Sequence, residues 1–427
     1  MKSLKIIIIL FALSCGTALF NGCLDAPVAP IGNVNGKVYD RYGYPAYYSV
    51  ISEGDYPIAK PDYKGNFTFD GIKYPYDLVV GSEPQNESKY IGLSSNIAIV
   101  YDYIGFDIPA LNYRIAVSFP PLKSQKTLFI NFLSADNFKQ LNYTGAFYRG
   151  DSLFGIGFYM HGLNPQINGK LMYLEASTDG SGRIISYDKF GIKNVTLYTN
   201  ELDQRFDFSP DEINHTPETG TLNFTVTAPN NLDTRFTDCF INFPSLNNCS
   251  DIMLEEIAYE NSGSFNVPVF TGIDYRFKMN NIYYNWPVYN PFKKTGQKWE
   301  FAKPGNNVTI THDAPIVLLT PPDRQNSVSD STTFSIFDPG EKGVYVFKFF
   351  DGMESTQTSV FTDKTSFKFA ELRSRLVNFP HNYTSYWCVI KYPKYTTIND
   401  FVAVNYVTDD LYNSIPCSQT FIFTTAP

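Results

Sequence analysis

The chain has 427 residues, of which 18% are charged and 16% are aromatic, with 36 Phe, 31 Tyr and 3 Trp. Hydrophobic residues make up 43% of it, enough for several buried cores, which excludes an intrinsically disordered protein. The formal net charge is −8 and no run of cations follows residue 5. Nucleic-acid binding needs clustered cations that displace phosphate counterions, so we expect no nucleic-acid partner.

The N-terminus has the features of a signal peptide. Two lysines precede the apolar run Ile6–Leu13, which is shorter than the roughly 20 residues that span a bilayer. Cleavage after Ala18 would give ordinary secretion, whereas Leu19-Phe-Asn-Gly22-Cys23 resembles a bacterial lipobox with Phe and Asn at unusual positions. We favour the second scheme, which makes residues 1–22 a signal peptide, Cys23 the lipidated residue and residues 23–31 a short tether.

The number of cysteines supports this choice. Cys15 is lost with the signal peptide, and lipidation of Cys23 leaves an even set, which suits disulfide formation in an oxidising compartment. Closeness in sequence predicts two local disulfides, Cys239–Cys249 and Cys388–Cys417.

Nine Asn-x-Ser/Thr sequons keep a secreted eukaryotic adhesion glycoprotein open as an alternative. The chain is rich in Asn, Ser and Thr, so chance accounts for many of them. The sequons are at Asn66, Asn86, Asn142, Asn194, Asn214, Asn223, Asn248, Asn307 and Asn382.

The rest of the chain has the pattern of an all-β protein. Short segments rich in Val, Ile, Phe, Tyr and Thr alternate with Gly, Pro, Asn and Asp, which predicts tandem β-sandwich domains. Helical periodicity is nearly confined to Asp251–Tyr259 and Phe369–Leu376.

Residues 32–112 show the clearest pattern of a single domain. A strand with Gly-x-Val, a turn with Gly-x-Pro, a Gly-x-Phe-x-Phe strand, Gly-Ile and Tyr-x-Leu-x-Val follow in order. This pattern resembles the carboxypeptidase regulatory-like family, which implies a transthyretin-like β-sandwich and carries no chemistry. The matching residues are Gly36, Val38, Gly43, Pro45, Gly65, Phe67, Phe69, Gly71, Ile72, Tyr76, Leu78 and Val80.

Three further units follow. Residues 113–212 form a β-rich unit of unknown type, and residues 213–312 repeat part of the first pattern, which predicts a second transthyretin-like sandwich. Residues 313–427 look like a fibronectin type III domain that opens on Pro321-Pro322. The usual core tryptophan of its second strand is replaced by Ile336, so other immunoglobulin-like relatives stay open.

Motifs with chemistry are weak in this sequence. Gly150-Asp-Ser-Leu153 spells the nucleophile block of GDSL esterases, but no Asp-x-x-His follows to orient and activate Ser152. The overlapping Arg149-Gly-Asp151 is interpreted as a turn. The four histidines are scattered and the cysteines form no CxxC pair, so we expect no metal site and no cofactor.

Aromatic residues cluster at Tyr284, Trp286 and Tyr289, and Trp299 and Phe301 follow. Such side chains bind sugars or protein partners when exposed, because they combine apolar area with a polar tip. The competing interpretation, which we favour, is that they pack the junction between two sandwiches.

Together these observations predict a non-catalytic, lipid-anchored protein of the bacterial cell envelope, in the outer membrane or at the cell surface, with a binding or scaffolding role. Its expected partners are the membrane, through the lipid anchor, and a carbohydrate or another envelope protein. The alternatives are a carbohydrate-active hydrolase or sugar-binding protein, and a secreted protein without the anchor.

Overall fold

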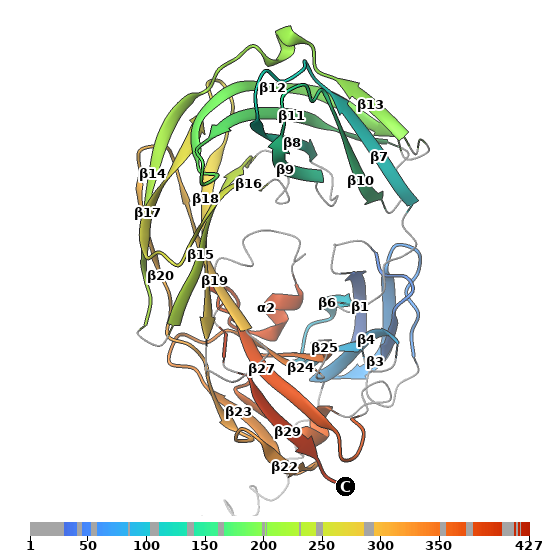
Figure 1. Cartoon of the computed structure of the whole chain (residues 1–427). Coiled ribbons are helices and arrows are strands. Elements are labelled where there is room, and N and C mark those ends of the chain that lie inside the picture. Colours follow the sequence, from blue (N-terminus) through green and yellow to red (C-terminus); the bar gives the residue numbers. More distant parts are fainter. Residues whose placement is uncertain are drawn as a thin grey trace, which may run out of the picture.

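A computed structural model describes most of the chain after residue 29 (Figure 1). The described residues are 30–40, 45–52, 58–83, 86–102, 111–134, 141–160, 166–198, 201, 203–229, 232–244, 251–285, 294–350, 356–372, 379–403, 414–415, 417–418 and 420–427. Nearly all elements are strands arranged in several sheets, which confirms the predicted all-β fold with tandem β-sandwiches. Within the described ranges, no helix has both the length and the hydropathy to cross a bilayer.

Unit 1 is built from the first six strands. The sheet β3-β1-β6 faces the strands β2, β4 and β5, and the two layers enclose Val34, Val38 and Leu78. The strands are β1 (Ile31–Asp40), β2 (Val50–Ser52), β3 (Asn66–Lys73), β4 (Tyr76–Glu83), β5 (Asn86–Leu93) and β6 (Ile97–Asp102).

Two glycines of the first sequence pattern have a steric reason. A Cβ on Gly36 would lie 1.9 Å from Cζ of Phe67, so the ring can cross β1 only where the side chain is missing. Gly65 has a φ of +79° and turns the chain into β3. The pattern therefore encodes the packing of β3 on β1. The family assignment itself stays a prediction.

Unit 2 spans the segment for which the sequence predicted no fold type. It is a sandwich of the sheets β10-β7-β13 and β12-β11-β8-β9. Its strands are β7 (Leu111–Ser118), β8 (Lys126–Ser134), β9 (Leu141–Phe147), β10 (Leu153–Met160), β11 (Gln166–Thr178), β12 (Ile184–Tyr198) and β13 (Asp203–Asp207), and the short helix η1 (Pro210–Ile213) follows.

Unit 3 pairs the sheet β17-β14-β20 with the sheet β16-β15-β18-β19. On β14 the side chains of Leu222, Phe224 and Val226 are buried and the residues between them are exposed, the expected alternation of a half-buried strand. The strands are β14 (Glu218–Thr227), β15 (Leu232–Asn242), β16 (Ile252–Ala258), β17 (Ser262–Val269), β18 (Arg276–Asn285), β19 (Lys294–Ala302) and β20 (Asn307–Thr311).

Units 1, 2 and 3 share one strand arrangement. In each, the first strand pairs antiparallel with a middle strand (β3, β10 or β17) and parallel with the last strand (β6, β13 or β20). The segment 251–259, whose periodicity predicted helical turns, contains the strand β16 instead. Its buried positions alternate at Ile252 and Leu254, so the period of two prevails.

Unit 4 is the C-terminal sandwich. The sheet β21-β23-β26 packs against β22, β24, β25, β27 and β29, and Trp387 is fully buried between the layers. The elements are β21 (Val317–Thr320), β22 (Gln325–Val328), β23 (Thr333–Phe337), β24 (Val344–Phe350), β25 (Thr356–Thr362), β26 (Ser366–Lys368), η2 (Phe369–Leu372), β27 (Thr384–Tyr392), α2 (Ile398–Val402), β28 (Ser414–Ile415) and β29 (Phe421–Thr425).

Units 1 and 4 share a single sheet. The eight strands β2-β4-β5-β25-β24-β27-β29-β22 are continuous, because β5 pairs in parallel with β25. Across this seam the rings of Tyr90 and Phe361 stack at 4.6 Å with an interplanar angle of 10°. The first and last units of the chain are therefore one folded body, which we call the lower lobe (Figure 1).

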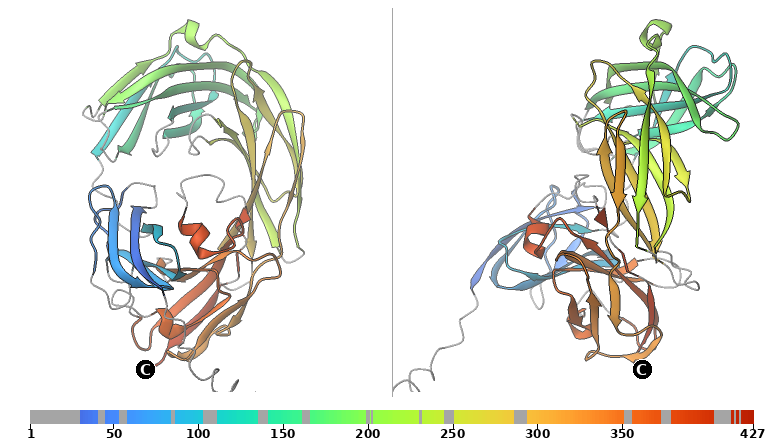
Figure 2. Two further views of the ribbon diagram at one scale, coloured as in Figure 1. Left: turned by 180° about the vertical axis from the view of Figure 1, so that it is seen from behind. Right: turned by 90° about the vertical axis from the view of Figure 1, so that its left-hand side faces the viewer.

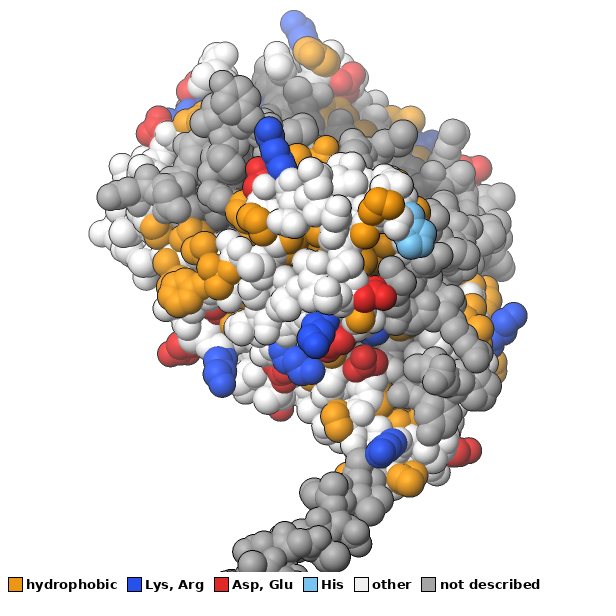
Figure 3. Space-filling model, turned by 90° about the horizontal axis from the view of Figure 1, so that it is seen from below, with side chains coloured by type: hydrophobic (Ala, Val, Ile, Leu, Met, Phe, Trp, Pro, Cys, Tyr) orange, Lys and Arg blue, Asp and Glu red, His pale blue; other side chains and the backbone are white. Residues whose placement is uncertain are grey.

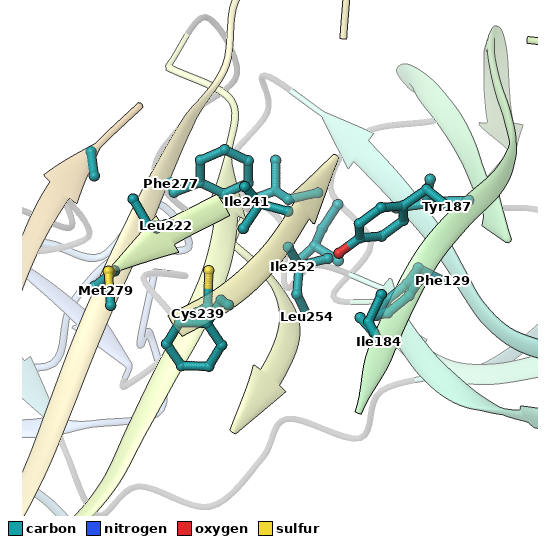
Figure 4. Packing of buried hydrophobic residues seen from close by; sticks show 14 of the residues in the cluster. Phe129, Ile184, Tyr187, Leu222, Cys239, Ile241, Ile252, Leu254, Phe277 and Met279 are labelled. Atoms are coloured by element: carbon teal, nitrogen blue, oxygen red, sulfur yellow. The ribbon is translucent and has the colours of Figure 1, made fainter. Parts of the chain in front are cut away.

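Units 2 and 3 form a second body, the upper lobe (Figure 2). Side chains of unit 2, including Phe129, Ile184 and Tyr187, are in the same apolar cluster as the core of unit 3 (Figure 4). The Tyr187 hydroxyl also donates to the Asn266 carbonyl on β17 at 2.9 Å. The chain thus runs from the lower lobe through the upper lobe and back again.

Candidate binding surface

Half of the eight residues of the predicted sites lie outside the described residues. These are Cys23, Cys249, Trp286 and Tyr289. The backbone of Tyr284 is described in β18, opposite Asp233 on β15 and Thr295 on β19, but its side chain is not. The predicted aromatic cluster therefore begins with Tyr284, the last residue but one of β18.

The predicted disulfide between Cys388 and Cys417 is not formed in the structure, so this pairing is not confirmed. Both side chains are buried, and Cys417 lies opposite Ile390 rather than Cys388. The two cysteines are thus diagonal neighbours, with Cα atoms roughly 7–8 Å apart in such a register. A disulfide normally needs Cα atoms within about 7 Å. Cys239 is likewise a buried thiol, in the core of unit 3.

The sheet β16-β15-β18-β19 has an outer face that carries polar and aromatic side chains. Cys239 and Met279 point into the core, so their neighbours along β15 and β18 lie on the opposite side. The outer face contains Phe236, Asp238, Phe240, Asn242, Arg276, Lys278, Asn280, Ile282, Trp299 and Phe301.

Two cations on this face are held by aromatic rings. The guanidinium carbon of Arg276 lies 3.3 Å from the ring centroid of Phe301, and Nζ of Lys278 lies 3.9 Å from that of Trp299. Lys278 also donates to Oδ2 of Asp251 at 2.5 Å. Trp299 is only 4% exposed. This part of the predicted aromatic region therefore packs within the fold.

Nearer the connection between β18 and β19, the outer face becomes more exposed. Tyr259 is 63% exposed and its ring centroid lies 6.2 Å from that of half-buried Phe236. Phe236 lies opposite Ile282 in the β15–β18 ladder, three residues before the end of β18. We call Phe236, Tyr259 and Ile282 the aromatic edge. It is the described surface next to the predicted cluster.

Sequence reasoning missed Phe236 and Tyr259 because they are distant in sequence from the predicted cluster. Phe236 is on β15 and Tyr259 follows β16, and only strand pairing brings them beside β18. A signal was present in Tyr259, an aromatic residue directly before the polar turn Glu260-Asn-Ser262.

One carboxyl group beside the aromatic edge is poorly solvated. Asp238 is 5% exposed, accepts a hydrogen bond from Nδ2 of Asn280 at 3.3 Å, and has no partner for Oδ1 among the described residues. Burial raises the pKa of Asp238 to about 6, and the nearby carboxylate of Glu256 acts in the same direction.

A smaller apolar patch lies on unit 4. Val317, Leu319 and Phe337 are each about half exposed, and Val317 lies opposite Phe337. Hydrophobic side chains gather on the face of the molecule seen from below (Figure 3). This patch contains no Tyr or Trp whose polar tip could orient a ligand, so we base the candidate site on unit 3.

The remaining motifs have structural roles. Asp151 accepts a hydrogen bond from the Tyr148 amide at 2.7 Å and Gly150 has a φ of +96°, so this segment is a turn that leads through Ser152 into β10. His312 is buried in unit 3 and His381 is near the C-terminus, 3.4 Å from the Ala426 carbonyl. Among the described residues, no three His, Cys, Asp or Glu side chains group as metal ligands would.

Comparison with known proteins gives no family. No family model matches the chain, and no curated protein matches it. Solved structures with a similar arrangement include the TIE protein of Bacillus anthracis, with 11% identity and a TM-score of 0.16 over 66% of this chain and 50% of that chain. This chain therefore matches half the length of that protein.

Two further structures are similar at the same level. A putative adhesin from Bacteroides ovatus has 8% identity and a TM-score of 0.18, covering 49% of this chain and 94% of its own. BcpA, the major pilin subunit of Bacillus cereus, has 9% identity and a TM-score of 0.14, covering 66% of this chain and 98% of its own. TM-scores this low carry no argument about function.

Proposed function

We propose that this protein is a non-catalytic, lipid-anchored protein of the cell envelope, and that its sandwiches form a scaffold that presents a binding surface. The observation that carries the scaffolding role is the eight-stranded sheet shared by units 1 and 4. The predicted signal peptide and the lipobox-like Leu19–Cys23 segment support the anchor.

The shared sheet suits a scaffold for a physical reason. Tandem domains joined only by linkers move independently, whereas a continuous sheet with a common core fixes their relative orientation. Here the seam joins β5 to β25, so the first unit is bound to the last. The units between them are consequently held at both ends.

The position of the anchor would orient this scaffold. Seven residue steps separate Cys23 from Pro30, the first described residue. An extended chain of this length reaches at most roughly 25 Å. A lipid on Cys23 would therefore keep the lower lobe close to the membrane surface.

The anchor is tested by metabolic labelling with a radioactive fatty acid. We expect Cys23→Ser to abolish labelling and to release the protein from membranes, because the acylated thiol is removed. Cys15→Ser is the matched control, since that residue lies within the predicted signal peptide and should leave labelling intact. Labelling of the Cys23→Ser protein at the wild-type level would refute the lipid anchor.

The second candidate function is recognition of a carbohydrate or of another envelope protein by the aromatic edge. Exposed Tyr259 beside Phe236 favours it, because an aromatic face can stack on a sugar ring while the hydroxyl forms hydrogen bonds. Tyr284 of the predicted cluster follows Ile282 by two residues in β18, and the cluster would extend this surface.

Tyr259→Asn tests this function with little effect on the backbone. Tyr259 has a φ of 61°, a left-handed conformation that Asn tolerates better than most residues. We expect loss of binding to glycan arrays or envelope extracts with an unchanged melting temperature. Tyr63→Asn, in a turn of unit 1 with 65% exposure, is the control and should bind normally.

Trp286→Ala decides between binding and packing for the predicted cluster. Truncation of a buried tryptophan costs about 3–5 kcal/mol, which a thermal melt reports as a drop of several degrees. An exposed binding residue would instead lose ligand while the melting temperature stays constant. A large fall in melting temperature would remove Trp286 from the proposed binding surface.

A further inference from the structure

The two lobes have separate cores. Each hydrophobic cluster found among the described residues belongs to one lobe: units 1 and 4 share two of them, and unit 3 shares one with unit 2. A body with its own core can move relative to its neighbour unless further contacts hold it. The contacts between the lobes therefore decide whether the two lobes keep a fixed orientation relative to each other.

One strand of the lower lobe crosses to the upper lobe. β28 comes from the segment that connects β27 to β29 in unit 4, yet it pairs with β19 of unit 3. The ladder joins Ser414 to Lys298 and Ile415 to Gln297. It extends the main sheet of unit 3 with a strand from the other lobe.

Both sides of this crossing segment are fixed to the lower lobe. On the N-terminal side, α2 buries Ile398, Phe401 and Val402 in the core shared with unit 1. Oδ1 of Asn399 accepts hydrogen bonds from the amides of Ser94 at 2.7 Å and Ser95 at 3.0 Å. On the C-terminal side, the Ser418 amide donates to the Val389 carbonyl on β27 at 2.8 Å.

In the upper lobe, β28 pairs with β19 close to the buried side chain of Tyr283. Tyr283 of β18 is 2% exposed, and its hydroxyl hydrogen-bonds to Cys417, two residues after β28. The ring centroids of Tyr283 and His312 lie 4.5 Å apart, and Nε2 of His312 lies 2.5 Å from Oδ1 of Asn281. Tyr283 is thus a second contact of unit 3 with the returning chain, beside the ladder between β19 and β28.

We propose that β28 is a latch that holds the two lobes together and whose release lets them separate while both stay folded. The physical basis is that the contact between the lobes is much smaller than the hydrophobic core within each lobe. Among the described residues the contact is a two-residue ladder with one side-chain hydrogen bond, which contributes little compared with the shared cores. The latch should therefore open first, and the attachments at α2 and at Ser418 keep it in position to close again.

The test uses the full mature chain with Ser414→Pro and Ile415→Pro combined, because proline cannot donate to a ladder. We expect amide exchange in β19 to accelerate by about tenfold, the equivalent of one or two lost hydrogen bonds. The radius of gyration from small-angle X-ray scattering should rise, while the circular dichroism spectrum stays unchanged. Tyr283→Phe, a milder change, should move exchange and radius in the same direction.

Asn399→Ala is the matched control, because it loosens the same segment at unit 1 and leaves β28 intact. It should leave exchange in β19 and the radius of gyration unchanged. Faster exchange without a larger radius in the proline variant would overturn the proposal, since other contacts would then hold the lobes. Unchanged exchange, or equal opening by Asn399→Ala, would overturn it as well.

Discussion

Two buried ionisable side chains on the outer face of unit 3 differ in how well their charges are compensated. Lys278 has a carboxylate partner in Asp251 and a ring in Trp299, so its charge is compensated. Asp238 has one long hydrogen bond from Asn280 and a raised pKa. Its ionised form therefore costs folding free energy at neutral pH.

This gives a pH-dependent prediction for Asp238→Asn. The pKa is raised from 3.8 to about 6, so the folded state binds the proton more tightly than the unfolded state between these values. Wild-type stability should fall as the pH rises through this window and then stay level. The substitution removes this loss and should stabilise the protein at pH 7.5 by roughly 2–3 kcal/mol.

Urea unfolding at pH 4.5 and pH 7.5 measures the effect. The gain should shrink at pH 4.5, where the folded wild type already holds the proton. A gain of equal size at both values would show that ionisation is not its cause. Glu256→Gln, on the exposed side of the same pair, should give a smaller gain of the same sign.

At the scale of elements, β18 and β19 depend on a missing side chain. A Cβ at Gly296 would lie 2.2 Å from Cζ of Tyr283, which is buried and cannot move aside cheaply. The ring occupies the space above the glycine. The close packing of these two strands thus depends on Gly296 and Tyr283.

Gly296→Ala should destabilise unit 3 by about 1–3 kcal/mol through overpacking. Chemical denaturation measures the change. Gly155→Ala on β10 is the matched control, because no atom lies within 4 Å of its added Cβ. If Gly296→Ala were as mild as the control, the contact with Tyr283 would not limit the packing of these strands.

At the scale of the whole molecule, the lobes should be the units of unfolding. Tyr90 is fully buried at the seam between units 1 and 4 and stacks on Phe361. Tyr90→Ala should therefore cost about 3–5 kcal/mol and lower the unfolding transition of both units together. The transition of the upper lobe should stay in place.

Hydrogen exchange measured through a thermal ramp can assign each transition. Protection should be lost together in β4 and β27, which belong to different units of the lower lobe. Tyr187→Ala, at the contact between units 2 and 3, is the counterpart and should lower only the upper-lobe transition. Separate loss of protection in β4 and β27 would mean that the seam does not couple units 1 and 4.

The sequence alone determined the local structure, because local structure depends on near neighbours. Alternating apolar and polar residues predicted strands with one buried face, and β14 has this form with Leu222, Phe224 and Val226 buried. The sequence did not identify α2, which is only five residues long and shows too little periodicity to stand out.

Only the tertiary structure decided what covers each face and which edges meet. Glu87, Ser88 and Lys89 have the polar character of an exposed strand, yet they are buried where β5 joins β25. Cys388 and Cys417 are near in sequence but diagonal in register, and spacing in the sequence does not give this register. Side-chain alternation says which residues share a face, but it carries no information on a partner strand that is more than 250 residues away.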